Sequence, residues 1–157
     1  MSYSYNRNQS KLTYSLIVPK TLNEGDLDYM KQMSLVSLLV KDYDQTIEFY
    51  TNKLGFVVAE DLPFGEKRWV TLRLPDNRES VIALGLAETN EDLALVGRQG
   101  GSTPFLGILT DDCMAEYHRM KNLGVTFHGE PHVEPYGTCV ILEDLYGNKI
   151  YMNQEPG

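Results

Sequence analysis

The chain has 157 residues, of which 42% are apolar, and a formal net charge of −8, so it is expected to fold as one globular domain with its own hydrophobic core. Its acidic surface repels phosphate backbones and anionic lipid headgroups, and no Lys/Arg-rich stretch reverses that charge locally, which disfavours nucleic acid and membrane surfaces as partners. No apolar run has the length of a signal-peptide core or of a membrane span, so a cytoplasmic location is expected.

Residues 1–32 differ in composition from the rest of the chain. The stretch from Met1 to Lys11 is rich in Ser, Tyr and Asn and shows no hydrophobic periodicity, and the apolar run 12–18 offers at most a short strand. We therefore expect an N-terminal extension that is partly disordered and to which no function is assigned. Residues 33–156 are expected to form the single domain.

Residues 33–88 are predicted to form a β-α-β-β-β unit. An apolar strand at 35–40 leads to Asp42 or Asp44, either of which can cap a helix by accepting hydrogen bonds from its first free N–H groups. Apolar side chains then recur at helical spacing on one face, until Gly55 ends the helix. Three predicted strands follow at 56–59, 68–74 and 81–86, with turn regions at 61–67 and 75–77.

Residues 103–155 repeat this order after a linker at 89–102. A capping turn precedes a predicted helix at 113–123, which Gly124 ends. The predicted strands of this half lie at 104–109, 125–128, 138–143 and 149–153, and a loop with two prolines occupies 129–137. A shift of 69 or 70 residues superposes the strand, the capped helix and the glycine of the two halves, which indicates an internal duplication.

Some cysteines and histidines could carry chemistry. Cys113 and Cys139 have no CxxC spacing and are interpreted as buried free thiols, with a disulfide or a catalytic thiol as the alternatives. His118 falls on the outer side of a predicted helix, and His128 and His132 flank a turn. These three histidines are interpreted as surface or loop residues, because no Cys or Glu pattern completes a metal set around them.

Residues 40–44 (Val-Lys-Asp-Tyr-Asp), with Phe49-Tyr50 and the run 53–56 (Lys-Leu-Gly-Phe), resemble the first-repeat signature of the vicinal-oxygen-chelate superfamily of glyoxalases, bleomycin-resistance proteins and dioxygenases. The run 143–148 (Glu-Asp-Leu-Tyr-Gly-Asn) resembles that superfamily's closing turn before its last strand. The resemblance covers about 33–155. It implies an α+β fold in which two tandem βαβββ units form a curled mixed sheet around a cleft.

The resemblance also implies where a metal would bind, because metal-dependent members hold a divalent ion through His and Glu side chains on the first and last strands of the units. In this chain those positions fall on Leu35, on Pro104 or Phe105, and on Tyr151, while the strand 81–86 offers only aliphatic residues and glycine. Apolar side chains cannot ligate a divalent ion. We therefore expect no metal and no other cofactor, and an apolar pocket in which the phenol of Tyr151 donates a hydrogen bond.

Two further features have a structural and a functional interpretation. The loop that often overhangs the cleft in this fold carries His132, Glu134 and Tyr136, which form either a polar lid or a His/Glu pair able to move protons. Trp69, the sole tryptophan, either packs in the core or offers a stacking wall for a planar ligand.

The resulting hypothesis is a metal-independent small-molecule-binding protein, similar to bleomycin-resistance-type members, that acts as a homodimer. The ligand-binding residues are expected to be Leu35, Ser37, Trp69, Phe105, Tyr136 and Tyr151. Of these, Ser37 and Tyr151 are expected to orient the ligand while the others exclude water. The alternatives are an enzyme, either a metal-dependent lyase or isomerase of glyoxalase type or a ring-cleaving dioxygenase, and a partner-binding module whose cleft is filled by core side chains.

Overall fold

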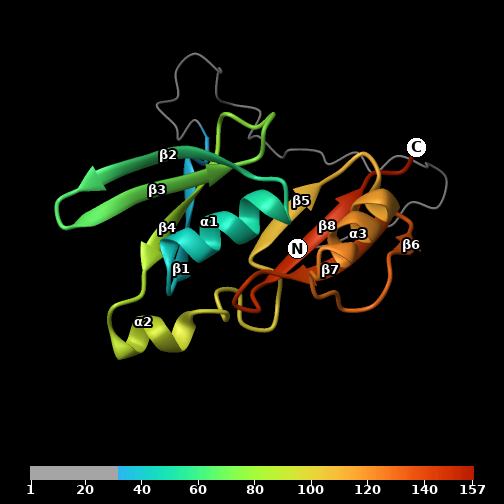
Figure 1. Cartoon of the computed structure of the whole chain (residues 1–157). Helices are drawn as coiled ribbons and strands as arrows, with labels where there is room; N and C mark the ends of the chain where they lie inside the picture. The colour runs from blue at the N-terminus through green and yellow to red at the C-terminus, as the bar shows by residue number, and fades with distance from the viewer. Residues whose placement is uncertain (1–31) are drawn as a thin grey trace, which may run out of the picture. The chain divides into compact units, whose positions relative to one another are not determined.

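The computed structural model describes residues 32–157. The predicted N-terminal extension therefore lies outside the described residues except for its last position. The elements follow in the order β1 (Leu35–Val40), α1 (Tyr43–Asn52), β2 (Val57–Phe64), β3 (Lys67–Arg73), β4 (Val81–Leu86), α2 (Asn90–Leu95), β5 (Leu106–Leu109), α3 (Cys113–Asn122), β6 (His132–Glu134), β7 (Gly137–Glu143) and β8 (Lys149–Gln154) (Figure 1).

The predicted duplication is confirmed by the topology of two four-stranded sheets. The first sheet has the order β1-β4-β3-β2 and the second the order β5-β8-β7-β6. In each sheet the first strand pairs in parallel with the last strand of its unit, and the remaining pairs are antiparallel. One helix lies across each sheet, α1 on the first and α3 on the second (Figure 1). The fold is therefore α+β with two tandem βαβββ units.

Both long helices begin at a predicted capping aspartate. Asp42 Oδ1 accepts a hydrogen bond from the backbone N of Gln45 at 2.8 Å, and Asp112 Oδ1 accepts one from Ala115 at 2.9 Å. The two caps are 70 residues apart, whereas the glycines that follow the helices, Gly55 and Gly124, both at φ +78°, are 69 apart. The segment from the capping aspartate to the glycine is thus one residue shorter for α3 than for α1, which explains why neither a shift of 69 nor one of 70 fits the whole repeat.

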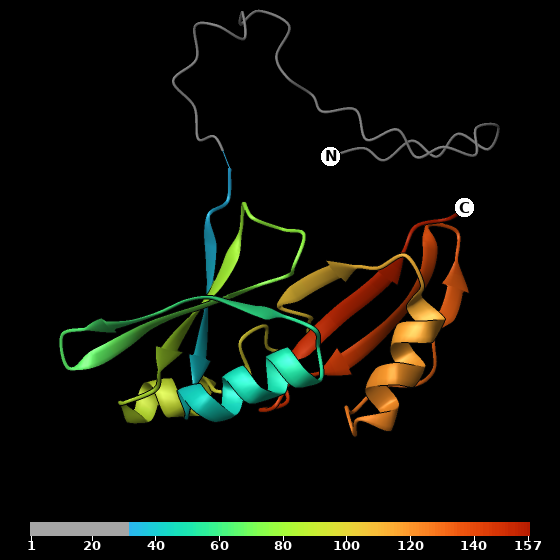
Figure 2. The same cartoon turned by 45° about the horizontal axis from the view of Figure 1, so that its top comes forward.

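The prediction of a turn region at 61–67 is wrong for most of its length. Strand β2 continues to Phe64, and only two residues separate it from β3, with Gly65 at φ +62°. Pro63 misled the prediction, but β2 is the edge strand of its sheet, where a proline leaves no ladder hydrogen bond unmade. Figure 2 shows the β2–β3 hairpin reaching beyond the other two strands of the sheet.

The predicted strand at 125–128 is also wrong, because this segment forms only an isolated bridge between Phe127 and Leu142. The strand of this part of the fold, β6, lies instead inside the predicted loop and pairs with β7. The turn after β6 ends at Gly137, whose φ of +133° and tight packing against the backbone of β8 allow no side chain.

The core of the described residues continues from one unit into the other. It combines the inward side chains of both sheets with the buried faces of α1 and α3, among them Leu38, Tyr50, Leu72, Met120, Val140 and Ile150. The hydroxyl of Tyr50 in α1 donates to Asp144 Oδ2 at 2.9 Å, and Asp144 lies in the turn before β8. A buried hydrogen bond therefore links the two units directly. No helix of the described residues is long and apolar enough to cross a membrane.

Candidate functional site

Each sheet has one face covered by its helix and one face turned away from it, here called the open face. In the first sheet alternate residues separate the two faces: Leu38, Val70 and Leu72 are buried against α1, and their neighbours point the other way. The open face of the first sheet is formed by Leu35, Ser37, Leu39, Val57, Glu60, Leu62, Phe64, Lys67, Trp69, Thr71, Arg73, Val81, Ala83 and Gly85. The largest exposures on this face are those of Phe64, at 69%, and Leu62, at 53%, among its apolar side chains.

The open face of the second sheet is more polar. It is formed by Gly107, Leu109, His132, Glu134, Cys139, Ile141, Glu143, Tyr151 and Asn153, with Tyr136 in the turn between β6 and β7. The thiol of Cys139 is buried and lies 3.6 Å from Nε2 of His132, which in turn lies 3.5 Å from Oε1 of Glu134. Both cysteines are free and buried, as predicted.

Two phenols border this thiol. Burial raises the pKa of Tyr151 well above its usual value, and the neighbouring thiol of Cys139 raises it further. Desolvation also raises the pKa of Tyr136, to which Glu134 and Cys139 add. Both hydroxyls therefore stay protonated at neutral pH and can donate hydrogen bonds to a ligand.

The structure divides the six predicted ligand-binding residues into separate groups. Leu35, Ser37 and Trp69 lie on the open face of the first sheet, while Tyr151 lies on that of the second, next to the turn with Tyr136. The sixth residue, Phe105, precedes β5 and packs against the hydrophobic core. Within one chain these residues do not converge on a single pocket.

Trp69 lies at the surface of the sheet rather than inside the core. Its side chain is 37% exposed, and its Nε1 donates to Glu60 Oε2 at 2.9 Å. Beside it, Thr71 is 1% exposed, yet its hydroxyl has no hydrogen-bond partner among residues 32–157. Thr71 was not among the predicted site residues. The alternation of Trp69, Thr71 and Arg73 along the strand already placed the threonine on the same face as the tryptophan.

The three histidines have ordinary surroundings. Nε2 of His128 lies 2.7 Å from Oε1 of Glu143, and both side chains are partly exposed. The ring of His118 packs edge-on against Tyr117. The pairing of His132 with Glu134, predicted from their loop, is the one that lies beside other polar groups of the open face.

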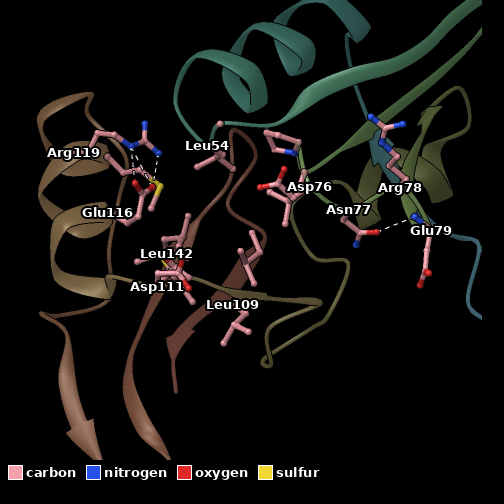
Figure 3. A pocket seen from close by; sticks show the side chains of 17 residues that line it. Leu54, Asp76, Asn77, Arg78, Glu79, Leu109, Asp111, Glu116, Arg119 and Leu142 are labelled. Carbon is pink, nitrogen blue, oxygen red and sulfur yellow. Dashed lines mark hydrogen bonds and ion pairs between the residues drawn. The ribbon is translucent and has the colours of Figure 1, made fainter. Parts of the chain in front are cut away.

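A cleft of about 850 Å³ lies between the two units on the side of the helices (Figure 3). Leu54, Leu142 and other core side chains form its floor. Charged residues surround it, and the Glu116–Arg119 ion pair, at 2.7 Å, stands on one side (Figure 3). A smaller hollow of about 160 Å³ adjoins it. None of the six predicted ligand-binding residues lines either space.

Residues 32–152 match the family model of the Glyoxalase/Bleomycin resistance protein/Dioxygenase superfamily. The chain belongs to this superfamily. An uncharacterised protein of Shewanella frigidimarina is 40% identical to it over 76% of this chain and 90% of its own. Among solved structures, UcmS2 is 30% identical with a TM-score of 0.72, covering 80% of this chain and 98% of its own. TnmS3, an antibiotic binding protein from Streptomyces sp. CB03234, is 26% identical with a TM-score of 0.67, covering 81% and 98%.

The superfamily's metal-dependent members bind a divalent ion, but the donor set of this chain does not fit one. At the positions that would hold the ligands, β1 presents Leu35, β8 presents Tyr151, and the segment before β5 presents Pro104 and Phe105. The partner of Leu35 on β4 is Val81. Among residues 32–157 no three His, Cys, Asp or Glu side chains gather closely enough to hold a metal.

Proposed function

We propose that this superfamily member binds a small, partly apolar organic molecule without using a metal, and that it does so as a homodimer. One observation carries the proposal: leucine, proline or phenylalanine, and tyrosine stand where metal-dependent members have their ligands. Aliphatic and aromatic walls with few polar groups are the usual lining of sites for organic ligands. Its similarity to TnmS3, an antibiotic binding protein, supports the same class of function.

The proposed walls combine both open faces. Ser37 and Tyr151 orient the ligand, since the first is an exposed hydroxyl and the second a protonated phenol beside Cys139. Leu35, Trp69, Phe105 and Tyr136 complete the set and exclude water. A hydrogen bond between neutral groups in such a site contributes about 1 kcal/mol, so shape and apolar contact dominate the affinity.

A homodimer follows from the separation of these residues. In one chain, the open face of the first sheet leaves Leu62, Phe64 and Trp69 exposed to water by 53%, 69% and 37%. Exposed apolar patches of this kind mark interaction surfaces. A second copy that lays the open face of its second sheet over this surface would join the two halves of the ligand-binding set. Two symmetric copies would then carry two equivalent sites.

The binding test is a thermal-shift screen of the full chain against a panel of antibiotics and metabolites. A ligand that binds the folded state raises the melting temperature by mass action. For a compound that this screen identifies, Tyr151→Phe is expected to weaken the affinity of the protein about fivefold, the equivalent of ~1 kcal/mol. The melting temperature of the free protein is expected to stay the same. Tyr43→Phe is the matched control, because that phenol lies on α1 and its ring packs against Arg68, whose side chain is on the opposite face of β3 from Trp69.

Two further measurements complete the test. Size-exclusion chromatography with light scattering is expected to give twice the chain mass, and a monomer at micromolar concentration would refute the dimer. Elemental analysis is expected to find substoichiometric metal. One equivalent of nickel, zinc, manganese or iron, with an activity lost to a chelator, would instead establish a metal-dependent lyase, isomerase or dioxygenase.

A further inference from the structure

A row of polar side chains crosses the open face of the first sheet. The strand registers place Ser37 of β1 beside Ala83 of β4, Ala83 beside Thr71 of β3, and Thr71 beside Glu60 of β2. Side chains paired in this way across neighbouring strands lie within contact of one another. Ser37, Thr71 and Glu60 therefore form a polar row, interrupted only by the small side chain of Ala83.

The hydroxyl of Thr71 is the unusual member of this row. It is 1% exposed, and its Oγ1 has no hydrogen-bond partner among residues 32–157. Buried hydroxyls in folded proteins are nearly always paired, so an unpaired one of this kind calls for a partner that is not among these residues. Trp69 lies two residues before Thr71 on β3, so its indole is on the same face of the sheet, and it is 37% exposed.

Glu60 offers an acceptor next to this hydroxyl. One carboxylate oxygen, Oε2, accepts the indole N–H of Trp69 at 2.9 Å, while Oε1 has no partner among the described residues. Two cations, Lys67 and Arg73, lie on the same face. Lys67 pairs with Glu88, and the guanidinium of Arg73 donates to the carbonyl of Leu74 at 3.1 Å. Lys67 is therefore paired with a carboxylate, whereas Arg73 donates to backbone carbonyls and keeps its positive charge beside the row. The row itself presents a hydroxyl donor and a carboxylate acceptor.

We propose that this polar row recognises a hydroxyl group on a planar aromatic ring by hydrogen bonding. The ring lies on the indole of Trp69, the ligand hydroxyl donates to Glu60 Oε1, and the hydroxyl of Thr71 donates to the same ligand oxygen. A phenol fits because one oxygen both donates and accepts. This inference rests on the proposed function, since it names the ligand class of that site.

The test compares two probes that differ only in this hydroxyl, 2-naphthol and 2-methoxynaphthalene, titrated by calorimetry into the full chain. The unsubstituted chain is expected to bind 2-naphthol about tenfold more tightly. Thr71→Val, which keeps the shape of the side chain, is expected to lower 2-naphthol affinity about fivefold and to lower the affinity for the ether less, because an aryl ether oxygen is the weaker acceptor. Glu60→Gln, which can still accept the indole N–H, is expected to reduce the preference as well.

The stability of the free Thr71→Val protein separates a ligand-binding role from a structural one. Because the variant removes an unpaired buried hydroxyl, its melting temperature is expected to stay the same or to rise by roughly 2–4 °C. A lower melting temperature would mean that the hydroxyl makes a structural hydrogen bond, and the inference would be wrong.

The remaining outcomes each decide against the inference. Equal affinity of the unsubstituted chain for both probes would show that the row does not recognise the ligand hydroxyl. It would not contradict the proposal that the chain binds an organic ligand. Failure of both probes alongside hits in the thermal-shift panel would refute the phenol class but not the binding function. If dilution of the protein changed the fluorescence of Trp69, the sole tryptophan, but addition of 2-naphthol did not, the indole would pack against the second copy and not against a ligand ring.

Discussion

Replacing Tyr50 by phenylalanine tests how the two units hold together. The side chain is fully buried, and its ring packs edge-on against Phe56 at a centroid distance of 5.3 Å. Its hydroxyl donates to Asp144 Oδ2 at 2.9 Å, from α1 of the first unit to the closing turn of the second. Phenylalanine keeps the ring and removes only this bond, so the change in stability reports on the link itself.

The magnitude follows from what the carboxylate retains. Asp144 Oδ2 still accepts the side-chain amide of Asn148 at 2.9 Å, and Oδ1 still accepts the backbone N of Tyr146 and Asn148, each at 2.9 Å. The buried carboxylate is therefore not left unpaired. Loss of one hydrogen bond to a charged group then costs about 2 kcal/mol, or about 6–10 °C in melting temperature for a domain of this size.

Urea denaturation followed by circular dichroism measures this loss, and Tyr43→Phe is the matched control. Tyr43 also lies on α1, but no hydrogen bond of its hydroxyl is present among the described residues, so the control is expected to change stability by less than about 0.5 kcal/mol. If Tyr50→Phe cost no more than the control, the hydrogen bond to Asp144 would not stabilise the pairing of the units.

Three other predictions concern the same fold. Burial raises the pKa of Tyr50 and Tyr151 above the value of about 10 for an unfolded chain. The free energy of unfolding is therefore expected to be independent of these two groups below pH 10 and to fall above it, by up to about 1.4 kcal/mol per pH unit for each group. Tyr50→Phe should make this fall shallower in alkaline denaturation curves. Gly137→Ala should cost more than about 2 kcal/mol, because its Cβ would stand 2.0 Å from a backbone oxygen of β8, whereas Gly65→Ala, with open space around it, should cost about 1 kcal/mol. Asp112→Ala should lower stability by about 1 kcal/mol through loss of the α3 cap, and an unchanged denaturation midpoint would contradict that role.

Local patterns account for most of the predicted elements. Capping aspartates, helical spacing and alternation depend on residues close in the chain, so β1, both long helices, β4 and β8 were predicted to within about two residues. Proline was the main source of error. Pro63 in β2 and Pro135 in the turn after β6 suggested breaks, but an edge strand and a hairpin turn both tolerate the missing N–H.

By itself, the sequence determined the repeated βαβββ order, because capping aspartates, helix-ending glycines and strand patterns depend only on residues close in the chain. Only the tertiary structure decided that five of the six predicted wall residues are divided between the second sheet and the open face of the first, and that Thr71 is buried without a partner among residues 32–157. Those facts depend on which strands pair and on what covers each face. Such contacts join residues far apart in the chain, and no local pattern records them.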